Sequence, residues 1–252
     1  MCLRVNLSDR SNVCDAWGSE RMGQGLYVEA RIRADMDELW DRTQRPEQHR
    51  RWDLRFTHID YLERSEGEPQ RFRYGVRVLP GLMVAGTGTA AGERHRPDGT
   101  RTSALRFASA HPLSPLAEGS GYWRYIPTPD GIRFLTGYDY EPRWGRTGRV
   151  ADRLLFRPLM GWATAWSFDR LRLWLERGIS PGQALRRTLA EIVVRTLAVV
   201  ATVPLGPALS GFFVMAALFL PPLPGTPAGR RCLRRRPEGV TAPVVLESLE
   251  QP

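Results

Sequence analysis

The chain has 252 residues, of which 42% are hydrophobic and 25% are charged, and this globular composition excludes a largely disordered chain. The mean hydropathy of -0.35 excludes a protein built mainly of membrane spans. The formal net charge is +9, and all 36 basic residues are arginine. Because these arginines are scattered and are not gathered with aromatic residues on one element, we expect no nucleic-acid partner.

The first 23 residues have neither helical nor strand periodicity, and we expect them to form a disordered extension without a signal peptide. One interpretation is that translation starts at Met22, just before the first strand. The cysteines are odd in number and have no metal-ligand spacing, which favours a reducing cytoplasm. They are Cys2, Cys14 and Cys232.

The first regular elements are a strand and two short helices. Apolar and polar residues alternate over residues 26–33, as expected for a half-buried strand. Asp35, with Glu38 three residues later, is typical of a capping box at the start of a helix. Pro46 then ends or restarts that helix, so a second short helix is predicted over residues 46–51.

An antiparallel meander follows, because strand-like runs recur at regular spacing with tight polar turns between them. The predicted strands cover residues 56–62, 71–79, 82–93, 102–108, 121–126 and 132–140. The next stretch, residues 148–177, has the pattern of an amphipathic helix, with Pro158 as a kink or as its true start. A helix of this length must lie across the sheet, because no hairpin could enclose it.

This order of elements is that of the helix-grip fold, an α+β fold whose curved antiparallel sheet wraps around a long C-terminal helix. The segment from Val28 to Trp40, with the Trp52-Asp53 pair, resembles the START/SRPBCC superfamily, which includes polyketide cyclases and lipid-transfer domains. The resemblance covers residues 24–178. It implies a hydrophobic cavity between the sheet and the long helix.

Aromatic side chains of the strands and the long helix would line such a cavity. The candidate ligand-binding residues are Phe72, Tyr74, Trp123, Tyr125, Phe134, Tyr138, Trp162 and Trp166. The alternative is that each of them belongs to an ordinary core. The predicted activity is binding, transport or sequestration of a hydrophobic small molecule such as a lipid, an isoprenoid or a polyketide.

Residues suited to catalysis are sparse. The four histidines form no triad with a serine and an acid, and no cluster of histidine and cysteine suits a metal, so we expect no cofactor and no metal. His58, two residues before Asp60 on a predicted strand, is a weak candidate for a general base. A polyketide cyclase or aromatase therefore stays open as an alternative, and a non-catalytic interaction subunit with a filled core is another.

A charge-free segment of 34 residues, 196–229, follows the predicted domain. Its hydrophobic part is long enough to span a bilayer, which takes about 20 residues. Pro204 and Pro207 stand near its middle and favour a hairpin with arms over residues 189–203 and 208–221. Because such arms are too short to cross a bilayer, a re-entrant or interfacial anchor is predicted; a full span and packing on the domain stay open.

Arginines flank this segment on both sides, and those between Arg230 and Arg236 suit an anionic membrane surface. We therefore expect residues 179–224 to attach a cytoplasmic domain to the inner face of the cell membrane. Residues 225–252, rich in proline and arginine, are predicted to be a disordered tail.

Overall fold

The computed structural model of the protein describes residues 25–63, 68–79 and 82–237. Outside these ranges lie the end of the predicted tail, from residue 238 onward, and the predicted N-terminal extension with Cys2, Cys14 and Met22.

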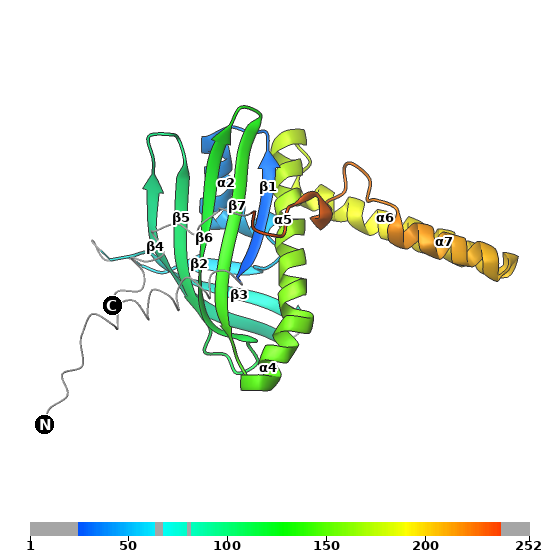
Figure 1. Ribbon diagram of the computed structural model, residues 1–252, viewed down its shortest axis with the longest axis horizontal. Coiled ribbons are helices and arrows are strands. Elements are labelled where there is room, and N and C mark those ends of the chain that lie inside the picture. Colours follow the sequence, from blue (N-terminus) through cyan, green and yellow to red (C-terminus); the bar gives the residue numbers. More distant parts are fainter. Residues whose placement is uncertain (1–24, 64–67, 80–81, 238–252) are drawn as a thin grey trace, which may run out of the picture.

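Seven antiparallel strands form one sheet in the spatial order β1-β7-β6-β5-β4-β3-β2 (Figure 1). The chain runs as a meander from β2 to β7, and β7 then pairs with β1 from the start of the domain. One long helix packs against this sheet, so the predicted α+β helix-grip class is confirmed. The strands are β1 (Leu26–Ile32), β2 (His58–Tyr61), β3 (Arg71–Leu79), β4 (Leu82–His95), β5 (Arg101–Ala108), β6 (Leu116–Thr128) and β7 (Gly131–Pro142).

Irregular pairing contributes to the curvature of the sheet. The register between β4 and β5 shifts between Ala90 and Gly92. Gly92 has a φ of 146°, which residues other than glycine rarely adopt. A second shift lies between Leu116 and Gly119, ahead of the stretch predicted as a strand over residues 121–126. Bulges of this kind bend and twist a strand, which helps the sheet to wrap around a helix.

Two short helices cross one end of the sheet, α2 (Met36–Gln44) and α3 (Pro46–Trp52). The Asp35 carboxylate caps α2 by accepting hydrogen bonds from the backbone N–H groups of Asp37 and Glu38. Arg45 is extended between the two helices, as expected for a residue before a proline.

The long helical stretch begins as α4 (Gly145–Ala151), passes through a wide π-helical turn, η1 (Asp152–Phe156), and continues as α5 (Arg157–Arg177). Pro158 lies in the first turn of α5, directly after the π-helical turn, so the proline stands where the helical geometry changes. Gly178 ends α5 with a φ of 64°.

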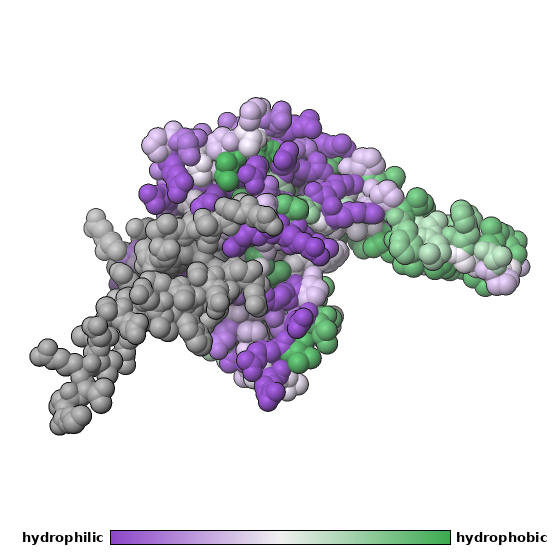
Figure 2. Space-filling model, in the orientation of Figure 1, coloured by the Kyte–Doolittle hydropathy of each residue, from purple (hydrophilic) through white to green (hydrophobic). Residues whose placement is uncertain are grey.

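A helical hairpin projects from the domain beyond the end of α5 (Figure 1). It consists of α6 (Pro181–Thr202), a short 3-10 turn, η2 (Val203–Leu205), and α7 (Pro207–Phe219), so the chain reverses where the two prolines predicted it. Figure 2 shows it as a hydrophobic rod. Within the described part of the chain, one segment, Pro181–Leu205, is long and apolar enough to cross a membrane.

The chain after the hairpin is ordered as far as residue 237, which corrects the disorder expected from residue 225 onward. A short turn, η3 (Gly229–Arg231), packs against α5, and Leu233 exchanges two backbone hydrogen bonds with Glu29 of β1. The fully buried Asp169 carboxylate of α5 accepts hydrogen bonds from the Ala228 N–H and from Arg231. These contacts offset the entropy that favours disorder in an arginine-rich segment.

Cys232 belongs to the same segment and is buried against α5, where its thiol contacts the Ala165 carbonyl. Burial raises the pKa of this thiol to about 12, so it is protonated and unreactive at neutral pH.

Candidate functional site

The sheet has an inner face, which is turned toward α5, and an outer face. The Phe134 ring of β7 stacks on Phe168 of α5 with a centroid distance of 4.4 Å. The hydroxyl groups of Tyr138 and Thr164 lie 3.1 Å apart, again between β7 and α5. Because side chains alternate along a strand, these contacts assign every second residue of β7 and of its neighbours to the inner face.

Three of the predicted ligand-binding residues form part of a closed aromatic core on β6 and β7. They are Trp123, Tyr125 and Phe134, and they pack with one another and with Trp52 and Phe168. All five side chains are buried. The alternative interpretation, that such residues are ordinary core, therefore applies to this half of the inner face.

A row of hydrogen-bonded polar side chains, here called the polar line, borders this closed core. The Tyr125 hydroxyl lies 2.7 Å from the Thr43 hydroxyl and accepts a hydrogen bond from the Gln44 side chain at 2.9 Å. The Gln44 amide oxygen in turn accepts from the Ser103 hydroxyl of β5 at 3.3 Å. Burial raises the pKa of Tyr125 well above its ordinary value, so its hydroxyl stays neutral.

The other half of the inner face, on β3 to β6, carries aromatic rings that lie over glycines. The Phe72 ring covers Gly88, and the Phe107 ring covers Gly119. A side chain on either glycine would occupy the place of the ring, so glycine is what allows the rings to lie against the sheet. Phe72 and Phe107 are both half-buried, and this half of the face is therefore less closed than the core.

Tyr74 joins this group, since its ring covers Gly86 and contacts Phe56 at 5.8 Å. Tyr74 is buried, and burial raises its pKa to about 12. Phe107 was not among the predicted residues. The alternation along residues 102–108 indicates that Phe107 and Ser103 lie on the same face of their strand. Only the strand pairing shows that this is the inner face of the sheet.

A buried ion pair lies where α3 leads into β2. The Asp53 carboxylate contacts Arg55 at 2.7 Å and the Nε2 atom of His49 at 3.0 Å. Burial by itself would raise the pKa of Asp53, but Arg55 and His49 outweigh it and hold that pKa far below the ordinary value. The Arg55 guanidinium also lies over the Tyr138 ring, 5.6 Å from its centroid. This cluster fixes the chain between α3 and β2 beneath the long helix.

His58 lies on the outer face, because its neighbour Ile59 points inward and is buried. The His58 side chain is 51% exposed and pairs with Asp60 at 2.5 Å. This position does not fit the predicted role of general base in an internal pocket.

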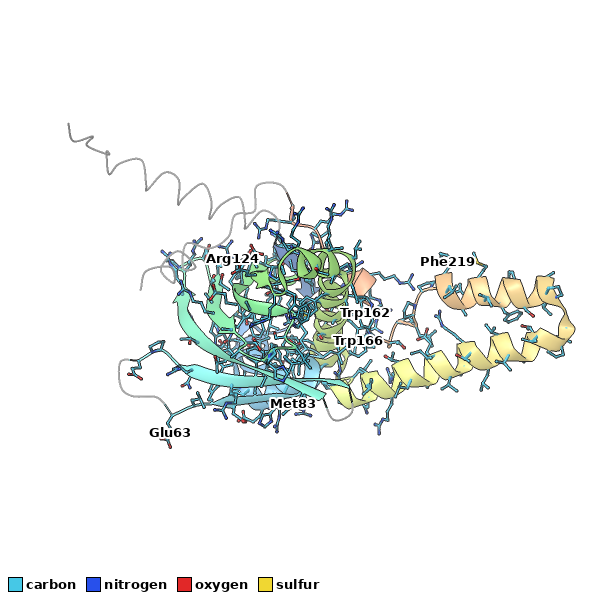
Figure 3. All side chains as sticks on the ribbon, turned by 90° about the horizontal axis from the view of Figure 1, so that it is seen from below. Glu63, Met83, Arg124, Trp162, Trp166 and Phe219 are labelled. Atoms are coloured by element: carbon cyan, nitrogen blue, oxygen red, sulfur yellow. The ribbon has the colours of Figure 1, made fainter. Side chains whose placement is uncertain are left out.

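Trp162 and Trp166 lie on the side of α5 that faces away from the sheet and toward the hairpin (Figure 3). Trp162 is 46% exposed, whereas Trp166 is buried beneath Trp162 and Arg170. The prediction that both line the space between sheet and helix is therefore wrong in geometry. α5 has apolar residues on two of its faces, and sequence periodicity alone could not show which of the two packs against the sheet.

Two surface hollows of about 580 and 1150 Å³ lie away from the half-buried rings. The smaller one is at the end of the sheet around Asp35, His95 and Pro127, and the larger one lies beside β1 and α5 around Glu29 and Arg172. Neither is lined by a predicted ligand-binding residue. In the described ranges, no group of three or more histidine, cysteine or acidic side chains could hold a metal ion.

No protein-family model matches the chain. Among curated proteins, the chain is 49% identical over 168 residues to the "Uncharacterized membrane protein YndG" of Bacillus subtilis (strain 168). The match covers 66% of this chain and 63% of that protein, so this chain spans less than two thirds of its relative's length.

The chain is also similar to solved structures of lower identity. The di-domain ARO/CYC StfQ from the steffimycin biosynthetic pathway is 17% identical, with a TM-score of 0.47, over 68% of this chain and 59% of that one. The STAR-related lipid transfer protein from Xanthomonas axonopodis is 17% identical, with a TM-score of 0.44, over 59% of this chain and 84% of that one. Human StAR-related lipid transfer protein 5 is 13% identical, with a TM-score of 0.42, over 66% of this chain and 98% of that one. Each likeness concerns the fold alone.

Proposed function

We propose that the protein binds a hydrophobic small molecule on the inner face of its helix-grip domain and that the α6–α7 hairpin holds this domain at a membrane. The observation that carries the first half is the pair of half-buried rings, Phe72 and Phe107, lying over Gly88 and Gly119. A partly exposed aromatic surface of this kind favours an apolar ligand, because the rings and the ligand both lose contact with water when they meet.

The polar line beside these rings would orient an amphiphilic ligand. Ser103 and Gln44 lie at the border between the closed core and the half-buried rings, and both carry hydrogen-bonding groups. A ligand with an apolar chain and one polar end, such as a lipid, an isoprenoid or a polyketide, would suit this arrangement.

The hairpin supports attachment to a membrane. Its apolar side chains are largely exposed, with Phe212, Leu218 and Phe219 each about two thirds exposed or more, and water is a poor solvent for such a surface. α7 has 13 residues and is therefore about 20 Å long. A bilayer has an apolar core of about 30 Å, so a re-entrant hairpin fits better than a full span.

Charges at the base of the hairpin suit the level of lipid headgroups. Arg186 and Arg187 are exposed near the start of α6, and Arg230 donates a hydrogen bond to the Leu220 carbonyl where α7 ends. Arginine at this depth would attract the phosphate groups of an anionic leaflet.

Ligand binding is tested with the full-length protein in detergent. Native mass spectrometry before and after organic extraction should reveal a bound molecule, and a dansyl-labelled fatty acid serves as the probe in titrations. We expect Phe72→Ala and Phe107→Ala each to weaken binding of the probe about tenfold. Met83→Ala, on the outer face of β4, is the matched control and should leave binding unchanged.

If the purified protein carries no small molecule and the probe does not bind, the interaction-subunit alternative takes the place of this proposal. If Met83→Ala weakened binding of the probe equally, the loss of affinity would reflect lower stability of the protein and not a ligand contact on the inner face.

A further inference from the structure

The start of the long helical stretch exposes apolar side chains that the domain does not cover. Leu154 is 74% exposed and Leu155 is 68% exposed, and both belong to η1. Val150, Leu159 and Trp162 are also exposed along α4 and α5. Leu155, Leu159, Trp162 and Trp166 follow one another at helical spacing, and we name the exposed residues of this surface the α5 stripe: Val150, Leu154, Leu155, Leu159 and Trp162.

The α5 stripe lies on the same side of the domain as the hairpin. Figure 3 shows Trp162 on the side of α5 from which the hairpin projects. Figure 2 shows a second hydrophobic patch on that side, lower on the domain and separate from the hairpin. From Leu155 to the end of α5 at Arg177 the helix extends about 33 Å, so the two apolar surfaces lie at opposite ends of one rigid rod.

The charges around the α5 stripe favour an anionic partner. Arg146, Arg149 and Arg153 are exposed and share one helical side with Val150 and Leu154. Between residues 143 and 168 the sequence has a single acidic residue, Asp152, which is buried and paired with Arg157. Exposed leucines and a tryptophan beside arginines, with no exposed acid, are typical of helices that lie in a lipid headgroup region.

We propose that the α5 stripe is a second membrane contact, at which an anionic bilayer receives its apolar side chains while Arg146, Arg149 and Arg153 meet lipid phosphates. This proposal rests on the membrane attachment proposed for the hairpin. With both ends of α5 in contact, the helix lies along the bilayer and the domain cannot swing about the hairpin. A hydrophobic ligand would then reach the domain from a fixed direction.

The test places an environment-sensitive NBD dye at single positions of the full-length protein. Cys2→Ser and Cys14→Ser remove the other two cysteines of the sequence, and the buried Cys232 stays in place. The labelled variants are Leu154→Cys on the α5 stripe, Phe212→Cys on the hairpin and Met83→Cys as the control on the outer face of the sheet. Each is mixed with vesicles of phosphatidylcholine and phosphatidylglycerol, with and without doxyl-labelled lipid as quencher.

We expect a blue shift and doxyl quenching at positions 154 and 212, and neither at position 83. The signal at position 154 should weaken several-fold in vesicles of phosphatidylcholine alone, because that surface has no net negative charge. It should fall further in Arg149→Gln/Arg153→Gln, because two of the arginines that would meet the lipid phosphates are then missing.

A signal at position 212 without one at position 154 would overturn the second contact while leaving the hairpin anchor intact. No signal at either position would overturn membrane attachment itself. A blue shift at position 154 that rises with protein concentration in the absence of vesicles would assign the α5 stripe to contact between two copies of the chain, and this outcome would also overturn the proposal.

Discussion

The Arg195 guanidinium of α6 donates a hydrogen bond to the Leu220 carbonyl at the end of α7, at 2.9 Å. It also donates to the carbonyls of Ala217 and Pro221, and it pairs with Glu191 one turn earlier on its own helix. The last carbonyls of a helix have no partner within the helix, and Arg195 donates to that of Ala217 in the last turn of α7 and to two carbonyls directly after the helix. One side chain thus ties the end of α7 to the middle of α6.

Removing this contact should loosen the end of α7. For Arg195→Gln we expect amide hydrogen exchange in the last turn of α7 to accelerate at least about tenfold, because charge-assisted hydrogen bonds to its carbonyls are lost. Mass spectrometry of exchanged peptides makes the measurement. Arg186→Gln, an exposed arginine earlier on α6, is the control, and equal acceleration in the two variants would contradict the assigned role of Arg195.

The buried ion pair of Asp53 and Arg55 predicts a large loss of stability for Asp53→Asn. The substitution leaves the Arg55 guanidinium under the long helix without its counter-charge, and such a loss costs about 3–5 kcal/mol of unfolding free energy. Urea denaturation of the full-length protein in mild detergent measures it. Asp60→Asn removes the exposed partner of His58 and should cost less than about 1 kcal/mol. Similar costs for the two variants would contradict the prediction.

Asp53 also predicts how stability depends on pH. Its pKa in the folded protein lies below the value of about 3.9 for an unfolded chain, so the unfolded state takes up the proton first as the pH falls. The contribution of Asp53 is therefore complete above about pH 4 and is lost progressively below it. The urea midpoint, followed from about pH 6 to about pH 3, should fall, and it should fall less in Asp53→Asn. An unchanged midpoint in the wild type would contradict this expectation.

Replacing an aromatic residue by alanine should cost more unfolding free energy in the closed half of the inner face than in the half with partly exposed rings. Phe134→Ala removes a fully buried ring stacked on Phe168, and we expect a loss of about 3–5 kcal/mol in unfolding free energy. Phe72→Ala removes a half-buried ring and should cost about 1–2 kcal/mol. Denaturation of the two variants in parallel makes the comparison, and a cost for Phe72→Ala equal to that for Phe134→Ala would mean that the whole inner face is closed core.

The sequence by itself determined the local elements of this protein. Alternation and turn residues predicted β3 and the order of the meander, Pro158 indicated a kink or a start near the first turn of α5, and two prolines predicted the reversal of the hairpin, since these features depend on neighbours a few residues apart.

Only the tertiary structure decided on which face of the sheet or helix each side chain lies and which distant residues it contacts. His58 and Phe107 both stand on strands, yet strand pairing places one outside and the other inside. Trp162 and Trp166 belong to a helix with two apolar sides, and packing chose the other side for the sheet. The arginine-rich segment around Cys232 is ordered because Asp169, some sixty residues away, is buried beside it. Burial of a charge and pairing across the sheet depend on distant residues, and no local pattern carries that information.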